Sequence, residues 1–182
     1  MEEINTIKIE IESARERYKP RLIKYLLVAE APPDSLSRFF YYPDVFIHDY
    51  LFMGVAKALY PDMKEKHLES RRRKSGTIKR QILEKLKEEG FFLLDLSDLP
   101  LSLLNETLES QVPILIGKIK KLDLNDLKII LIKSSVYDAA YYELIKAGVG
   151  NVINRRITFP SSGGQTKFHN EFVAALKEAK YF

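Results

Sequence analysis

The chain has 182 residues, of which 46% are apolar and 30% charged, and these proportions fit a globular protein rather than a disordered one. Its apolar runs fall short of the roughly 20 residues of a membrane span, and its first residues lack the apolar core of a signal peptide, so we expect a cytoplasmic protein without membrane contact. Cysteine is absent, which excludes disulfides, thiol nucleophiles and cysteine-held iron–sulfur clusters, and the net charge of +4 suits either a nucleic-acid partner or an ordinary soluble surface.

The first predicted strand follows a charged N-terminal segment. Residues 3–18 are predicted to form a helix, although the alternation of isoleucine with polar residues over 7–11 leaves a strand as the alternative. Leu22–Ala29 is a short, almost uninterrupted apolar run, and it has the length and composition of a strand buried on both faces.

A carboxylate, a proline turn and an aromatic cluster follow this strand. Glu30 stands at its carboxyl end, and Pro32 and Pro33 exclude both helix and sheet pairing from the next residues. The cluster after them includes Phe39 and Phe40. Ligands of open α/β sheets bind just outside the carboxyl ends of the strands, so we predict that this stretch lines a functional site. The alternative is a solvated Glu30 beside aromatic residues of the core.

The next stretch contains the most basic run of the chain. Asp44 is predicted to cap a buried helix that ends near Tyr60. Residues 62–76 are highly charged and include the run Arg71, Arg72, Arg73 and Lys74. Charge patterning favours equally a solvated loop and a contact with nucleic acid. Residues 77–89 then predict an amphipathic helix closed by Gly90.

The remaining elements alternate between strands and helices. They are a strand at 91–94 that ends at Asp95, a helical stretch at 102–121 with a break near Pro113, a strand at 128–132 followed by Lys133, a helix at 136–147 closed by Gly148, a fourth strand at 152–158 and a last helix at 165–180. This alternation predicts a single α/β domain over residues 1–182, a three-layer α/β/α structure with a four-stranded parallel sheet.

A parallel sheet places the carboxyl ends of its strands on one edge. We therefore predict that Glu30, Asp95, Lys133 and Ser161 surround one cleft there. The loop Ser161, Ser162, Gly163 and Gly164 precedes the last helix, where backbone N–H groups bind anions, although an ordinary strand–helix turn has the same composition. The chain has no dinucleotide fingerprint, P-loop or nucleophile elbow, and its histidines lack metal-ligand spacing, so we predict no cofactor and no metal.

Two short motifs in this frame resemble the uracil-DNA glycosylase superfamily. That family carries G-E-A-P-G after the first strand and H-P-S-P before the last helix; the matching stretches are residues 29–33 (AEAPP) and 159–163 (FPSSG). The order and spacing agree over roughly residues 22–180. Ala29 and Pro33 replace both motif glycines, and Phe159 stands in place of the histidine that stabilises the departing base.

The resemblance implies roles for the predicted site residues. Glu30 is the catalytic residue that positions or activates water, and Phe39 or Phe40 stacks on an extruded base. Asp95 occupies the position where the family reads uracil with asparagine. A glycosylase would hold the DNA backbone phosphate at Ser161, Ser162 and Gly163. On their positive charge alone, Lys133 and the basic residues Arg71, Arg72 and Arg73 are further candidates for contact with the DNA backbone.

Three functions remain open at this point. The first is a divergent DNA glycosylase that hydrolyses the N-glycosidic bond of a damaged base. The second is a DNA-binding protein without catalysis on the same fold, because the family's histidine and asparagine are both replaced. The third is an enzyme that acts on a small nucleotide-like metabolite in the same cleft.

Overall fold

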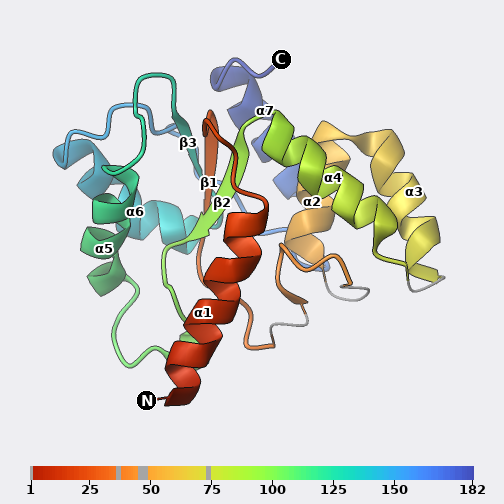
Figure 1. The fold of residues 1–182 in the computed structure, drawn as a ribbon. Coiled ribbons are helices and arrows are strands. Elements are labelled where there is room, and N and C mark those ends of the chain that lie inside the picture. Colours follow the sequence, from red (N-terminus) through yellow and green to blue (C-terminus); the bar gives the residue numbers. More distant parts are fainter. Residues whose placement is uncertain (1, 36–37, 45–48, 73–74) are drawn as a thin grey trace.

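The computed structural model describes residues 2–35, 38–44, 49–72 and 75–182 (Figure 1). Its centre is a parallel sheet of three strands in the order β2-β1-β3, formed by β1 (Tyr25–Ala29), β2 (Phe91–Asp95) and β3 (Lys128–Leu131). Leu27 of β1 lies opposite Leu93 of β2 and Ile130 of β3, and all three side chains are buried. The apolar runs predicted as strands therefore form a sheet covered on both faces.

The predicted fourth strand at 152–158 is not a continuous strand. Val152 forms an isolated parallel bridge with Ile129, and Ile157 forms one with Ile132. The two bridges are five positions apart on this segment but only three positions apart along β3 and the residue after it. The two extra residues break the ladder, and the Arg155 N–H donates to the carbonyl two residues earlier at 2.9 Å. The sheet has three regular strands, and an irregular segment lies along the free side of β3.

Seven α-helices flank the sheet in the described part of the chain. They are α1 (Glu2–Arg17), α2 (Tyr50–Leu59), α3 (Pro61–Arg72), α4 (Thr77–Glu88), α5 (Val112–Ile119), α6 (Ser134–Lys146) and α7 (Gln165–Glu178). In Figure 1, α5 and α6 lie on one side of the sheet, and α2, α3 and α4 lie on the other. Helix α7 packs against α2. None of the described helices is long and apolar enough to cross a membrane.

Helix boundaries follow local signals at several points. The helix predicted at the N-terminus is confirmed as α1, with Ile11 buried against the core. Gly90 and Gly148 follow α4 and α6 with φ of +87° and +81°, the left-handed conformation predicted for a residue just after a helix. Two further short turns of 3₁₀ helix, Leu101–Leu103 and Glu109–Gln111, replace most of the helix predicted before Pro113.

One prediction around residues 44–76 was wrong. Helix α2 begins at Tyr50, so Asp44 does not cap it. The charged segment after Pro61, for which a solvated loop was one of two alternatives, forms helix α3, which packs between α2 and α4. Proline is favourable at the first position of a helix because its missing N–H has no partner there, and Asp62 in the first turn complements the helix dipole.

A buried ion pair joins α1 to the end of β2. Arg15 Nη2 donates to Asp95 Oδ2 at 2.5 Å, and the two side chains are 0% and 3% exposed. Arg15 also donates to Glu12, whose side chain is half exposed. Removing one partner of a buried pair leaves an uncompensated charge, which is far more costly than removing both.

We therefore predict that Asp95→Leu lowers the free energy of unfolding by about 3–5 kcal/mol, because Arg15 cannot lose its proton. The double variant Asp95→Leu/Arg15→Met should regain most of this loss. Glu12→Gln is the matched control, since an exposed partner contributes about 0–1 kcal/mol. Urea unfolding measures all three. A double variant no more stable than Asp95→Leu would contradict the pairing as the cause.

Candidate functional site

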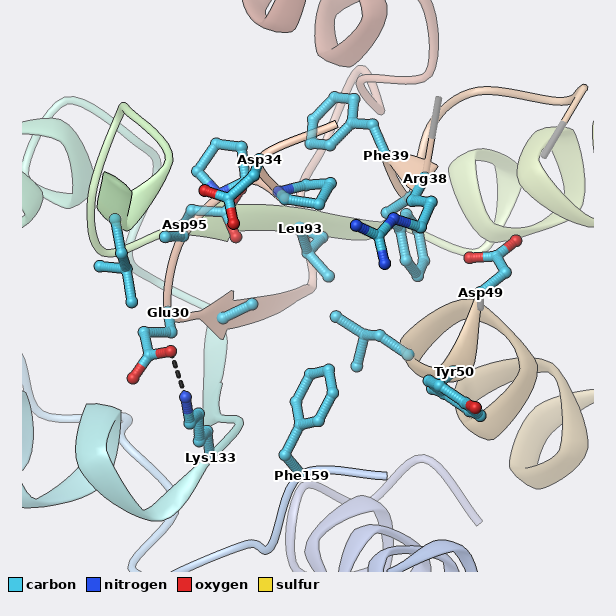
Figure 2. Close-up of a pocket in the computed structure, with 17 residues that line it drawn as sticks. Glu30, Asp34, Arg38, Phe39, Asp49, Tyr50, Leu93, Asp95, Lys133 and Phe159 are labelled. Atoms are coloured by element: carbon cyan, nitrogen blue, oxygen red, sulfur yellow. Dashed lines mark hydrogen bonds and ion pairs between the residues drawn. The ribbon is translucent and has the colours of Figure 1, made fainter. Parts of the chain in front are cut away.

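A cavity of about 390 Å³ opens at the carboxyl ends of β1 and β2 (Figure 2). Its size lies within the usual range for small-ligand pockets. It is lined by Ala29, Glu30, Ala31, Pro32, Pro33, Asp34, Arg38, Phe39, Phe40, Asp49, Tyr50, Leu51, Leu93, Asp95, Leu101, Lys133 and Phe159. The structure thus brings three of the four residues predicted at this edge, Glu30, Asp95 and Lys133, to one cavity.

Glu30 is held from two directions on one side of the cavity. Its Oε2 forms an ion pair with Lys133 Nζ, and its Oε1 accepts a hydrogen bond from Ser135 Oγ at 2.6 Å. Ser135 lies in the first turn of α6, where the helix dipole also favours a carboxylate. The Glu30 side chain is 16% exposed. These contacts fix the orientation of the carboxylate at the wall of the cavity.

The register of the sheet explains why Glu30 meets Lys133. Val28 of β1 pairs with Leu131 of β3, so residues two positions further along each strand lie opposite each other just beyond the ladder. Those residues are Glu30 and Lys133. Their ion pair therefore spans the gap between two neighbouring strand ends and depends directly on the parallel pairing.

Lys133 adopts a backbone conformation that a side chain rarely occupies. Its φ of +88° and ψ of +137° lie outside the regions allowed for most residues, where glycine is the usual choice. Such a conformation costs about 1–3 kcal/mol and is concentrated at functional sites. The turn between β3 and α6 is therefore strained, because a lysine that lines the cavity occupies a backbone conformation that suits glycine.

Asp95 lines the same cavity but has a partner in the core. Its carboxylate accepts from Arg15, as described above, and burial raises the pKa of Asp95 while the neighbouring guanidinium opposes that rise. The sequence did not indicate this pair, because the two residues lie 80 positions apart. Asp95 is thus a carboxylate fixed in place at the wall of the cavity.

The aromatic residues after the proline turn belong to both the core and the cavity wall. Phe39 and Phe40 are 1% and 6% exposed, and both line the cavity. Phe39 packs edge-to-face on Tyr41, and Phe40 does so on Phe52 of α2. The cluster therefore belongs to the core, as the second alternative predicted, and it also lines the cavity. Glu30 is not solvated as that alternative expected, because its side chain is only 16% exposed. Phe159, which follows the irregular segment, forms part of the opposite wall in Figure 2.

The loop before α7 does not join the site. Phe159 lines the cavity, but Ser161, Ser162 and Gly163 are exposed and are absent from its lining. The Ser161 N–H donates to the Phe159 carbonyl at 2.8 Å, and the Gly164 N–H donates to the Ser161 carbonyl at 3.0 Å. Two of the backbone groups predicted to bind an anion are thus used within the turn.

The basic run falls largely outside the described residues. Arg71 and Arg72 are the last residues of α3, and Arg73 and Lys74 lie in a part of the chain that the structure does not describe. The described residues continue from Ser75, and Gly76 packs against the segment that follows the aromatic cluster. A Cβ at Gly76 would lie 2.5 Å from Asp44 Oδ1 and 2.8 Å from the Pro43 carbonyl oxygen.

Sequence reasoning missed the residues at the far side of the cavity. Arg38, Asp49 and Tyr50 line it, and their spacing carries no recognisable signal. Asp49 accepts from Lys79 Nζ at 2.5 Å, and both side chains are buried. Lys79 lies on the predicted amphipathic helix but is not one of its apolar positions. The sequence pattern therefore gives no sign that Lys79 is buried and paired with Asp49.

No protein-family model, curated protein or solved structure matches this chain. Within the described residues, no group of three or more histidine or acidic side chains is placed to hold a metal ion. The interpretation of the site therefore depends on its own geometry.

The strain at Lys133 leads to a stability prediction. Lys133→Gly and Lys133→Ala both remove the ion pair with Glu30, but only glycine adopts φ of +88° at little cost. We expect the glycine variant to be more stable than the alanine variant by about 1 kcal/mol, after subtracting glycine's larger entropy cost. Thermal and urea unfolding measure this. The usual order, with alanine more stable, would show that the turn relaxes without strain.

Proposed function

We propose that the cavity receives a nucleotide of DNA and hydrolyses its N-glycosidic bond, with Glu30 as the catalytic residue. The observation that carries this proposal is the fixed Glu30 carboxylate on the wall of a cavity bounded by Phe39, Phe40 and Phe159. The motif similarity to uracil-DNA glycosylases over residues 29–33 and 159–163 supports the same function. The three-stranded parallel sheet and the irregular segment beside β3 are compatible with a divergent member of that superfamily.

The proposed reaction depends on the fixed position of the Glu30 carboxylate. As the bond between the sugar C1′ and the base nitrogen breaks, positive charge develops on the sugar and the electron pair leaves with the base. A carboxylate in a fixed position stabilises that charge and orients the attacking water, whose oxygen bonds to C1′. The proton that the water loses passes to the carboxylate and then to the departing base, so the products are the abasic sugar and the neutral base. The contacts of Glu30 with Lys133 and Ser135 suit this role, because they hold the carboxylate in one orientation at the cavity wall.

The apolar walls account for the binding of a base. Phe39, Phe40 and Phe159 line the cavity, and stacking on an aromatic ring stabilises a base by about 1–3 kcal/mol. Extruding a base from duplex DNA costs a few kcal/mol, and mismatched or damaged bases cost least. The basic run that begins at Arg71 and Arg72 would then contact the DNA backbone.

Phe159 favours a second function, binding without catalysis. A phenylalanine offers no hydrogen-bond donor to a departing base, where the family uses histidine. On this alternative the protein recognises a nucleotide in the cavity and leaves its glycosidic bond intact.

Glu30→Gln tests the proposed reaction. Removing the carboxylate charge should lower the rate of base release by about 10²–10³-fold, since it removes one electrostatic contact of the transition state. The assay follows release from oligonucleotides that carry a panel of damaged bases. Asp98→Asn is the matched control, because Asp98 also follows β2 and pairs with a lysine, Lys118, but does not line the cavity. Base release by Glu30→Gln at the parent rate would exclude this role. No release by the parent would favour the binding function.

The choice of base depends on Asp95. An ionised carboxylate accepts from an amino group but repels the O4 oxygen of uracil, and a mismatched buried polar partner costs about 1–3 kcal/mol. We therefore predict that amino-bearing bases are preferred over uracil and that Asp95→Asn shifts the preference toward uracil. Asparagine also retains an acceptor for Arg15. Competition assays measure the ratio of release rates, and melting checks the fold. Efficient uracil release by the parent, unchanged in Asp95→Asn, would contradict this prediction.

A further inference from the structure

Two cationic side chains line the cavity, and they differ in what they contact. Lys133 is paired with Glu30. Arg38 is exposed, and its guanidinium forms no hydrogen bond or ion pair with any residue that the structure describes. In Figure 2 the Arg38 guanidinium points into the cavity from the side of Asp49 and Tyr50, across from the Glu30–Lys133 pair.

Two further carboxylates of the lining, those of Asp34 and Asp49, are engaged by other donors. Asp34 accepts from Ser102 Oγ at 2.6 Å, and Asp49 accepts from the buried Lys79. Arg38 thus has two acidic neighbours in the lining and contacts neither of them. A charged donor directed into a cavity without a protein acceptor is available for an anionic ligand.

We propose that Arg38 binds a phosphate group of the nucleotide whose glycosidic bond lies beside Glu30. This inference rests on the proposed function and makes the ligand a phosphate-bearing nucleotide rather than a base or nucleoside. The planar guanidinium donates two parallel hydrogen bonds to a phosphate, a geometry that lysine does not provide. The first turn of α2, which begins at Tyr50 beside Arg38, adds a favourable partial charge.

The geometry of the cavity divides the ligand into three parts. The base lies against the aromatic walls, the sugar C1′ faces Glu30, and the phosphate lies at Arg38 on the far side. The same phosphate chemistry is found in a DNA strand and in a free nucleotide. Binding measurements distinguish these two sources without any turnover.

The experiment compares ligands that differ in the phosphate. Deoxycytidine, dCMP and a short single-stranded oligonucleotide with one central deoxycytidine are titrated into the parent, Arg38→Gln and Arg38→Lys by calorimetry. Arg21→Gln is the matched control, because Arg21 is an exposed arginine that precedes β1 at the opposite edge of the sheet. Melting temperatures check that each variant is folded.

We expect the parent to bind dCMP, the oligonucleotide or both at least about tenfold more tightly than deoxycytidine. Arg38→Gln should remove that difference, Arg38→Lys should restore part of it, and Arg21→Gln should leave it unchanged. Tighter binding of the oligonucleotide than of dCMP identifies a DNA strand as the source, and the reverse order identifies a free nucleotide.

The inference is overturned if the parent binds neither phosphate-bearing probe, or if Arg38→Gln keeps the parent's ratio of affinities. Its failure is distinct from failure of the proposed reaction. Loss of base release in Glu30→Gln with no effect of Arg38→Gln on binding would retain the catalytic role of Glu30 and reject the phosphate site. A phosphate-dependent affinity that Arg38→Gln abolishes, without any base release, would retain the phosphate site alone.

Discussion

The parallel pairing of β1 with β2 and β3 is the constraint on which the site depends. β1 lies between its neighbours, and the chain leaves all three strands at the same edge. Because Val28 pairs with Leu131, the residues just beyond the ladder, Glu30 and Lys133, face each other. A shift of either strand by one residue would turn these side chains to opposite faces, so the ion pair and the buried sheet require the same register.

Buried cations behind the cavity wall hold two of its carboxylates in fixed positions. Arg15 holds Asp95, and Lys79 holds Asp49, in pairs whose side chains are almost fully buried. Burying charges is costly even when they are paired, so these pairs are weak contributors to stability compared with an apolar core. They fix the positions of two carboxylates, however, and fixed dipoles and charges are effective in catalysis and recognition because they need no reorganisation.

Much of the fold could be predicted from local sequence. The apolar runs of the three strands and the glycines after α4 and α6 carry strong short-range signals, and the structure confirms them. The segment 152–158 shows the limit of that approach. Its composition is that of a strand, but the two extra residues between its bridges with β3 prevent a continuous ladder. The composition of a segment indicates that it suits a half-buried, pleated surface. Its pairing register, however, is set by the strand beside it.

The edge of the sheet at which the cavity opens could be predicted from the sequence, because alternating strands and helices place all strand ends together. The same pattern predicted that Glu30, Asp95 and Lys133 lie at that edge, since each follows an apolar run. The contacts of these residues depend on the tertiary structure. Arg15 reaches Asp95 across 80 positions, Lys133 adopts a conformation that its side chain does not favour, and Arg38 faces the cavity without a protein acceptor among the described residues. These features arise from packing between distant segments, and propensities that act within a few residues contain no information about them.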